Sequence, residues 1–159
     1  MTDKQDFEAK LWKSLRTDMT VMIGIAGADP RPMTAQFDGD RKPIYFFTAN
    51  DTEIAQKLGR AKKATLTFSA KRHDLFATIH GTLRIDQDRK VVDRLWNRFV
   101  ASWFEQGKDD PKLCLLRFDP ADAQVWLDAS SLVAGVKMFL GLSDPKKDYE
   151  DSVARIHIG

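Results

Sequence analysis

Residues 75–85 alternate two kinds of side chain without a break, and this pattern constrains the fold more than any other feature of the chain. Leucine, alanine, isoleucine and glycine at the odd positions alternate with phenylalanine, threonine, histidine and arginine at the even positions. A period of two is the spacing of a β-strand with one buried face. Gly81, in the middle of this predicted strand, indicates a bend or a close approach by another backbone.

Shorter segments predict further strands joined by tight turns. Gly27–Pro30 reads as a turn, and Asp38–Asp40 is a strong hairpin signal. The segment 44–49 is apolar on both faces and therefore predicts a central strand. Asp119 and Pro120 predict a break between the last two strands. The shorter strands are expected at residues 21–25, 33–37, 44–49, 64–70, 113–118 and 123–127.

Four segments carry the three-to-four-residue spacing of amphipathic helices, namely residues 6–17, 52–59, 88–106 and 131–141. Thr52 stands near the N-cap of the second segment and Gly59 at its end. Residues 143–159 mix charges of both signs with few apolar residues, which predicts a tail or a loosely docked segment. We therefore expect one domain over residues 1–142 and a polar C-terminal extension over residues 143–159.

Several hairpin-linked strands with short helices at their ends favour a mainly β fold. The expected architecture is an antiparallel β-barrel with helices packed on its outside. At 159 residues the chain is long enough to bury the core of one such domain.

Charge and cysteine content limit the kinds of partner. The net charge of +2 results from 25 basic and 23 acidic residues that are interspersed, so it gives no electrostatic case for nucleic-acid binding. Cys114 is the single cysteine, so neither an intrachain disulfide nor a thiolate metal site is expected. The first residues lack the apolar core of a signal peptide, and no apolar run reaches membrane-spanning length. These features predict a cytoplasmic protein with no nucleic-acid or membrane partner.

The sequence lacks the common constellations of catalytic side chains. His73, His80 and His157 share no metal-ligand spacing. No glycine-rich dinucleotide or phosphate loop and no Gly-x-Ser-x-Gly motif is present. Asp109 and Asp110 precede a proline, where acidic residues are typical of turns. A protein without its own nucleophile or acid–base pair can take its chemistry from a cofactor.

Aromatic residues are concentrated between residues 95 and 126, where three of the four tryptophans lie. Trp96 and Trp103 fall in a predicted helix, and Trp126 falls in a predicted strand. Because a tryptophan needs a large apolar slot and an acceptor for its N–H, such a group forms a planar aromatic surface. That surface is a core, a subunit interface or a wall for a flat ligand.

The order of these features resembles the general stress protein 26-like branch of the pyridoxamine 5′-phosphate oxidase-related, FMN-binding split-barrel superfamily. The resemblance spans about Phe7 to Asp128. The matching pieces occur in the family's order: Arg31-Pro32-Met33, then Ile44 to Thr48, then Thr78 to Leu83 with Asp86, then Leu95-Trp96, Trp103-Phe104 and Gly107 to Pro111, and finally Leu115-Leu116, Pro120 and Trp126.

This resemblance implies a split barrel of antiparallel Greek-key type, with a flavin, FMN or alternatively FAD, in a groove between the two barrels of a homodimer. Arg31 is the implied phosphate clamp, because guanidinium and phosphate form paired, charge-assisted hydrogen bonds. The start of the Thr52 helix would offer N–H groups to the same phosphate. The other implied flavin contacts are Pro32, Met33 and Thr34 beside the ring and ribityl chain, Phe47 and Thr48 on the next strand, and Trp103 or Trp126 from the partner subunit.

One position departs from the family's pattern. Family members often place a phosphate-contacting lysine where this chain has Ile54. Lys57, nearly one helical turn further on, is the candidate to replace it.

The sequence therefore predicts a flavin-binding, stress-related protein, and a flavin-dependent oxidoreductase using NAD(P)H or a similar reductant if it is an enzyme. Two alternatives stay open. One is a flavin carrier or sensor without catalysis. The other is a barrel that has lost flavin and acts as a small-ligand or protein-interaction module.

Overall fold

A computed structural model describes residues 4–127, 141 and 150–159, so most of the helix expected at 131–141 lies outside the described residues. The helices are α1 (Lys4–Asp18), α2 (Glu53–Leu58), α3 (Arg89–Leu95) and α4 (Arg98–Ala101), with a 3-10 turn η1 (Gly107–Asp109). The strands are β1 (Thr20–Ile25), β2 (Ala28–Thr34), β3 (Gln36–Phe37), β4 (Ile44–Ala49), β5 (Ala61–Ser69), β6 (Leu75–Ile85), β7 (Leu113–Leu127) and β8 (Val153–His157).

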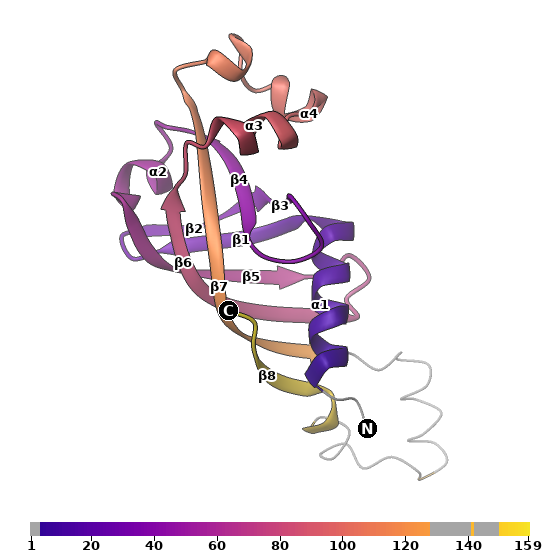
Figure 1. Cartoon of the computed structure of the whole chain (residues 1–159). Helices are drawn as coiled ribbons and strands as arrows, with labels where there is room; N and C mark the ends of the chain where they lie inside the picture. The colour runs from indigo at the N-terminus through magenta and orange to yellow at the C-terminus, as the bar shows by residue number, and fades with distance from the viewer. Residues whose placement is uncertain (1–3, 128–140, 142–149) are drawn as a thin grey trace.

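The strands form one curled antiparallel sheet in the order β2-β1-β5-β6-β7-β4-β3, with β8 paired to β7 (Figure 1). Strands β2 and β3 stand at opposite ends of this order, yet only Ala35 separates them in the chain. The Ala35 N–H donates to the Met19 carbonyl at 2.7 Å. The short link therefore draws the two ends of the sheet together, and the predicted mainly β barrel architecture with peripheral helices is confirmed.

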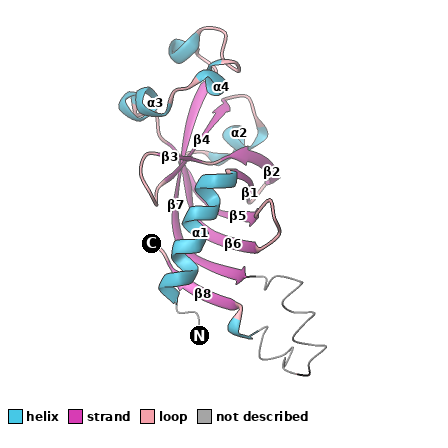
Figure 2. Cartoon of the chain, turned by 90° about the vertical axis from the view of Figure 1, so that its right-hand side faces the viewer, coloured by secondary structure: helices cyan, strands magenta, loops and turns pink. Residues whose placement is uncertain are grey.

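Helix α1 lies across the sheet and closes one side of the main core (Figure 2). Its buried stripe is Phe7, Leu11, Trp12 and Leu15, the stripe that the spacing predicts. The Trp12 ring meets the edge of Phe37 at a centroid distance of 6.1 Å and an angle of 89°. The helix is thus held on the sheet by apolar packing along its whole length.

Strand β4 is covered on both faces, as its sequence predicts. Ile44 and Phe46 point into the main core. Tyr45 and Phe47 point the other way, into a second apolar cluster with residues of β7 and of helices α3 and α4. Strand alternation thus makes β4 the wall between two packed layers.

The single helix predicted at residues 88–106 is wrong. Helix α3 ends at Leu95, and Trp96 has extended backbone angles of φ −63° and ψ 131°. The Asn97 side chain then caps α4 by accepting from the Val100 N–H at 2.9 Å. The Asn97 side chain also donates to the Leu95 carbonyl at 3.3 Å, so it bonds backbone groups at the end of one helix and at the start of the next. Trp103 therefore stands in a turn after α4 rather than in a helix.

The predicted break at residues 119–120 is also wrong, because β7 runs continuously from Leu113 to Leu127. The disturbance is a register shift against β6, where Gly81 pairs with Pro120 while His80 pairs with Asp122. One extra residue bulges out and the ladder continues. Strand β7 can therefore pair with β4 along its first half and with β8 along its second.

Two further boundaries differ from the sequence prediction. The expected turn at Gly27–Pro30 is shorter, because β2 already begins at Ala28; its prolines are tolerated because β2 is an edge strand. The segment expected to be a tail or a loosely docked segment contains β8 near its end, and Ile156 and Ile158 are buried in the main core. The ladder with β7 and the buried Ile156 and Ile158 side chains together dock this segment on the sheet.

Candidate functional site

A cavity of about 370 Å³ opens between β2, β4 and the α4 segment, within the usual size range of small-molecule sites. Eight of the ten residues predicted to contact flavin line it: Arg31, Pro32, Met33, Thr34, Phe47, Thr48, Thr52 and Trp103. Trp103 lines the cavity of its own chain, whereas the resemblance implied a contact from the partner subunit. The remaining lining residues are Gln36, Ala49, Phe99, Val100 and Phe104. The sheet therefore gathers residues of three separate sequence motifs around one space.

Arg31 is the cavity's charged residue. It pairs with Ile23 across the β1–β2 ladder, and Ile23 is fully buried, so Arg31 emerges on the inner face of the sheet. Its Nε is buried and has no hydrogen-bond partner. Within the described residues, Arg31 forms no ion pair. A buried guanidinium nitrogen without an acceptor is costly, and an anionic ligand group would satisfy it.

Two threonine hydroxyls stand at the end of β4. Thr48 is 7% exposed, and its Oγ1 lies 3.2 Å from Oγ1 of Thr52. Thr52 Oγ1 in turn donates to the Ala49 carbonyl at 2.9 Å instead of capping α2. Because a hydroxyl can rotate its proton toward another acceptor, this pair can serve a ligand oxygen beside Arg31.

Aromatic side chains make the opposite wall. Phe47 packs edge-on against Trp96 at a centroid distance of 6.2 Å, and Trp96 is tilted against Phe104 at 6.3 Å. Phe99 and Trp103 stand at the rim and are 60% and 71% exposed. Two large exposed aromatics beside a cavity mark a surface for a ligand or a partner to cover.

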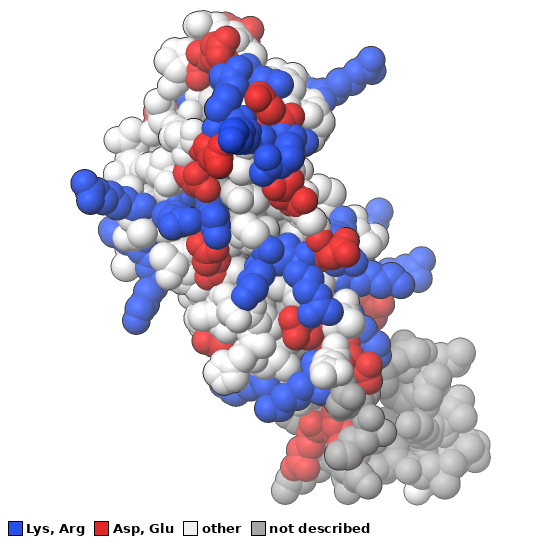
Figure 3. All heavy atoms as spheres, in the orientation of Figure 1, with Lys and Arg blue, Asp and Glu red and all other residues white. Residues whose placement is uncertain are grey.

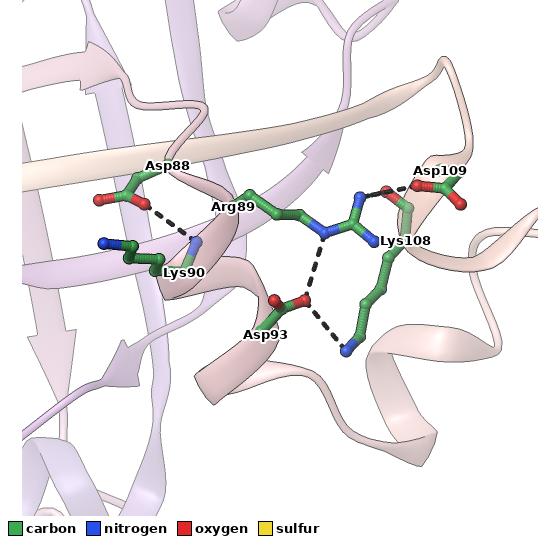
Figure 4. Close-up of polar contacts among 6 residues, drawn as sticks. All are labelled: Asp88, Arg89, Lys90, Asp93, Lys108 and Asp109. Atoms are coloured by element: carbon green, nitrogen blue, oxygen red, sulfur yellow. Dashed lines mark hydrogen bonds and ion pairs between the residues drawn. The ribbon is translucent and has the colours of Figure 1, made fainter.

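An ion-pair network fastens the chain that follows this rim (Figure 4). Arg89 of α3 bonds Asp93 at 3.2 Å and Asp109 of η1 at 2.7 Å, and Lys108 reaches the same Asp93 oxygen at 3.1 Å. Hydrogen bonding to Lys108 is the main cause that lowers the pKa of Asp93, and hydrogen bonding to Asp109 is the main cause that raises the pKa of Arg89. The turn behind Trp103 and Phe104 is thereby tied to α3.

Acidic and basic residues are intermixed over the face of the molecule that Figure 3 shows.

Gln36 is the polar residue among the five lining residues that the sequence did not predict. The alternation around it placed its side chain on a polar face of the strand, but it is only 8% exposed. Its partner across the ladder is Tyr45, so it shares the face that carries the aromatic cluster. The sequence shows that Gln36 is a polar residue close to the Arg31 motif, which could have marked it as a candidate. It does not show that the side chain of Gln36 is buried.

Two predicted residues, Lys57 and Trp126, do not line the cavity in this chain. Lys57 of α2 lies 3.6 Å from Glu53, in an exposed i,i+4 pair. Trp126 is the β7 partner of Phe76 and Val153. Ile54, where the family often has lysine, is fully buried in the main core. The cationic end of the cavity therefore depends on Arg31.

The composition of the lining limits its chemistry. Apart from Arg31, no charged residue and no histidine, cysteine or tyrosine lines it in the described part of the chain. Such a site can bind an anionic group and a flat ring, but it has no general acid or base of its own. No three metal-ligating side chains cluster among the described residues, and no helix there is long and apolar enough to span a membrane.

The curled antiparallel sheet defines a split-barrel protein, with a cavity at the β2 edge of the sheet. The model of the family described as pyridoxamine 5′-phosphate oxidase like matches residues 6–147, and the chain belongs to this family.

Solved structures narrow the relationship to general stress proteins. A general stress family protein of Xanthomonas campestris pv. campestris is 52% identical with a TM-score of 0.78, over 82% of this chain and 93% of the other. The general stress FMN/FAD binding protein of Xanthomonas citri is 49% identical with a TM-score of 0.77, over 80% and 93%. A general stress protein 26 of Jannaschia sp. CCS1 is 25% identical with a TM-score of 0.82, over 98% and 100%. The predicted family is confirmed.

Proposed function

We propose that this protein binds FMN, or alternatively FAD, in the cavity beside β2 and acts as a stress-related, flavin-dependent oxidoreductase. The observation that carries the proposal is the buried Arg31 Nε without a hydrogen-bond partner, at one end of a cavity whose other wall is aromatic. The similar Xanthomonas citri protein, described as FMN/FAD binding, supports the same ligand.

The residues present fit a flavin mononucleotide from end to end. Arg31 would hold the phosphate, with the Thr48 and Thr52 hydroxyls beside it. The apolar surface for a flat ring would come from Pro32, Met33 and Phe47. The exposed Trp103 side chain at the rim would pack over that ring.

A bound flavin supplies the hydride or electron exchange with a reductant such as NAD(P)H. The protein's part is to bind and orient the ring and to exclude water from one side of it. Since Arg31 is the one charged group in the described lining, the cavity offers no side chain suited to proton transfer.

We further propose a homodimer, because a band across one face of the sheet, from β2 to β7, carries no charged residue; we call this band the uncharged face. Register pairs Pro32 with Met22, Met22 with Thr67, Thr67 with Thr78, and Thr78 with Gln124. Residues paired in this way share a face. Met22 remains 40% exposed, as a residue of an unpartnered apolar surface does.

This uncharged face runs into the cavity, since Pro32 and Thr34 belong to both. It also carries Phe76 and Trp126 on the neighbouring register row. A second copy seated on it would bring its own aromatic residues toward the open side of the cavity. That arrangement gives Trp126 a place at the flavin site of the partner subunit, as the sequence predicts.

A flavin carrier or sensor without catalysis is the second candidate function. It is favoured by the lack of any acid–base side chain in the described lining. The two functions differ in what happens after loading. Rapid reduction of the bound flavin by NADH or NADPH supports the oxidoreductase, and a loaded protein that neither reductant reduces supports the carrier.

Titration with FMN and FAD, followed by flavin fluorescence, tests binding and its site. Removing the guanidinium and one hydroxyl together, in Arg31→Ala with Thr48→Ala, should weaken FMN binding by about a hundredfold. Arg31→Lys keeps a positive charge but loses the paired hydrogen-bond geometry of a guanidinium. Its affinity for FMN should lie between those of the wild type and the double variant.

Arg60→Ala serves as the matched control, because Arg60 is exposed and does not line the cavity. Equal FMN affinity in the wild type and the double variant would reject the proposed site. Failure of the wild type to bind either flavin would reject the proposed function itself.

A further inference from the structure

The cavity is built from two separate parts of the chain, and a tryptophan that does not line it contacts both. Phe47 belongs to β4, and Phe104 follows α4. Both of these residues line the cavity, whereas Trp96 lies outside the lining. The Trp96 ring meets Phe47 at a centroid distance of 6.2 Å and Phe104 at 6.3 Å. Trp96 therefore joins the strand wall of the cavity to its helix wall.

The two ring contacts restrict orientation as well as distance. Phe47 and Trp96 are nearly perpendicular, at 84°, and Trp96 and Phe104 are tilted by 40°. Aromatic pairs prefer particular ring orientations because the face and the edge of a ring carry opposite partial charge. The plane of the Trp96 ring thus limits the planes that both lining phenylalanines adopt.

The position of the Trp96 ring is set from outside the cavity. The Trp96 N–H donates to the Val92 carbonyl at 2.9 Å and completes the last turn of α3, which stands beside α4 at one end of the molecule (Figure 1). Helix α3 is itself held by Val91 and Val92 in the second apolar cluster. Its Arg89 also pairs with η1 beyond the rim (Figure 4). Trp96 is therefore carried by an element that is anchored without a ligand.

We propose that Trp96 is a positioning residue that fixes the spacing between Phe47 and Phe104, and with it the fit of a flat ring in the cavity. The inference rests on the proposed function and deepens it, because it assigns ring recognition to a residue outside the lining. No hydrogen bond, ion pair or ring contact among the described residues joins Trp96 to Arg31. The ring end and the phosphate end of the cavity should therefore respond separately to substitution.

Two fragments of FMN distinguish the ends of the cavity. Lumiflavin has the flavin ring without the ribityl phosphate, and ribose 5-phosphate has a sugar phosphate without the ring. Dissociation constants for FMN and lumiflavin are measured by flavin fluorescence. The dissociation constant for ribose 5-phosphate is measured by its competition with FMN.

Trp96→Leu removes both ring contacts. It should weaken the binding of FMN and of lumiflavin by about tenfold, while ribose 5-phosphate binds as it does to the wild type. Trp96→Phe keeps an aromatic ring, so its affinities for FMN and lumiflavin should lie between those of the wild type and of Trp96→Leu. Arg31→Lys should show the reverse pattern, with weaker binding of FMN and ribose 5-phosphate and unchanged binding of lumiflavin.

Trp12→Phe is the matched control for the loss of a tryptophan contact. Trp12 makes the same kind of contact with Phe37, at 6.1 Å and 89°, but it belongs to the main core and lies outside the lining. This variant should unfold at a lower temperature than the wild type because a buried side chain has become smaller. Its dissociation constants for FMN, lumiflavin and ribose 5-phosphate should stay unchanged.

Equal losses of affinity for lumiflavin and ribose 5-phosphate in Trp96→Leu would overturn the inference, because Trp96 would then have a general structural role. Unchanged affinity for lumiflavin would overturn it as well. If Trp96→Leu does not fold, Trp96→Phe decides: a loss confined to FMN and lumiflavin supports the inference, and no loss overturns it. A wild type that binds no FMN would instead reject the proposed function, so the two failures are distinct.

Discussion

Gly81 of β6 lies directly against Pro120 of β7, at the point where the longest strand pairing of the sheet shifts register. A Cβ atom added to Gly81 would stand 2.8 Å from the Pro120 Cα and 2.8 Å from the Phe118 Cζ. Real Cβ atoms do not approach backbone so closely. The glycine is required by the close approach of two backbones, because the bulge brings β7 over β6.

Gly81→Ala should therefore destabilise the fold by about 2–3 kcal/mol, since the nearest atoms are largely backbone and cannot move aside cheaply. Urea unfolding followed by tryptophan fluorescence gives this value. Gly39→Ala is the control: nothing lies within 4 Å of its added Cβ, so its effect should stay within about 0.5 kcal/mol. An equal loss of unfolding free energy in the two variants would show that β6 and β7 are not in close backbone contact at Gly81.

The pair between Arg94 and Asp38 should shape the stability of the protein in acid. Arg94 Nε and Nη2 bond the Asp38 carboxylate at 2.9 and 2.7 Å, and this hydrogen bonding lowers the carboxyl pKa. A lowered folded-state pKa stabilises the fold above the unfolded value of about 3.9, and the contribution is lost as pH falls through the folded value. Arg94→Leu should make the acid-side fall in unfolding free energy shallower.

The measurement is urea unfolding at a series of pH values from neutral down to about pH 2, below the usual carboxyl pKa. Arg41→Leu, which removes an exposed arginine paired with Glu8 at 2.8 Å, serves as a comparison for the loss of a surface charge. An acid limb that keeps the wild-type slope in Arg94→Leu would contradict the assignment to Asp38.

The network around Arg89 should control the order of the turn behind the cavity rim. Arg89→Met removes both carboxylate partners of the guanidinium while keeping an unbranched side chain. Amide hydrogen exchange of residues 104–110 should rise, while exchange in β5 and β6 stays at its wild-type rate. High salt should also raise the amide exchange of residues 104–110 in the wild type, because exposed ion pairs are screened. Unchanged exchange in the turn would mean that backbone packing alone orders it.

A negative charge on the uncharged sheet face should separate the proposed dimer. Thr67 lies in the middle of that face, between Met22 and Thr78 in the ladder. Thr67→Glu should give a monomer in light-scattering chromatography and weaken FMN binding, because the partner's contribution is lost. Lys62→Glu changes an exposed residue of β5 whose side chain lies on the opposite face from Thr67, and it should leave the molecular mass of the wild type unchanged. A wild type that is itself monomeric would contradict the dimer.

Much of the fold could be predicted because strand alternation is a local signal. The bounds of β4 and β6 agree with those predicted, since burial on one face or both is visible in the residues themselves. The end of α3 could not be found in this way. Its apolar spacing continues past Leu95, but Trp96 adopts extended backbone angles and the Asn97 side chain then caps a new helix.

The residues of the candidate site also differ in whether local sequence could predict them. Arg31, Thr48 and their neighbours could be found because they stand in motifs that keep their order along the chain. Gln36 and the strand β8 could not, because their positions follow from long-range pairing: Gln36 with Tyr45, and Ile156 with Ala123. Burial that depends on a distant partner leaves no periodic mark in the local sequence.

The most direct test of flavin binding is to purify the protein, record its visible absorption, denature it and identify the released small molecule by mass spectrometry. We expect FMN, or alternatively FAD, to be released in a ratio near one per chain. A colourless protein that also fails to take up added FMN or FAD would contradict it. The cavity beside Arg31 would then belong to a different ligand.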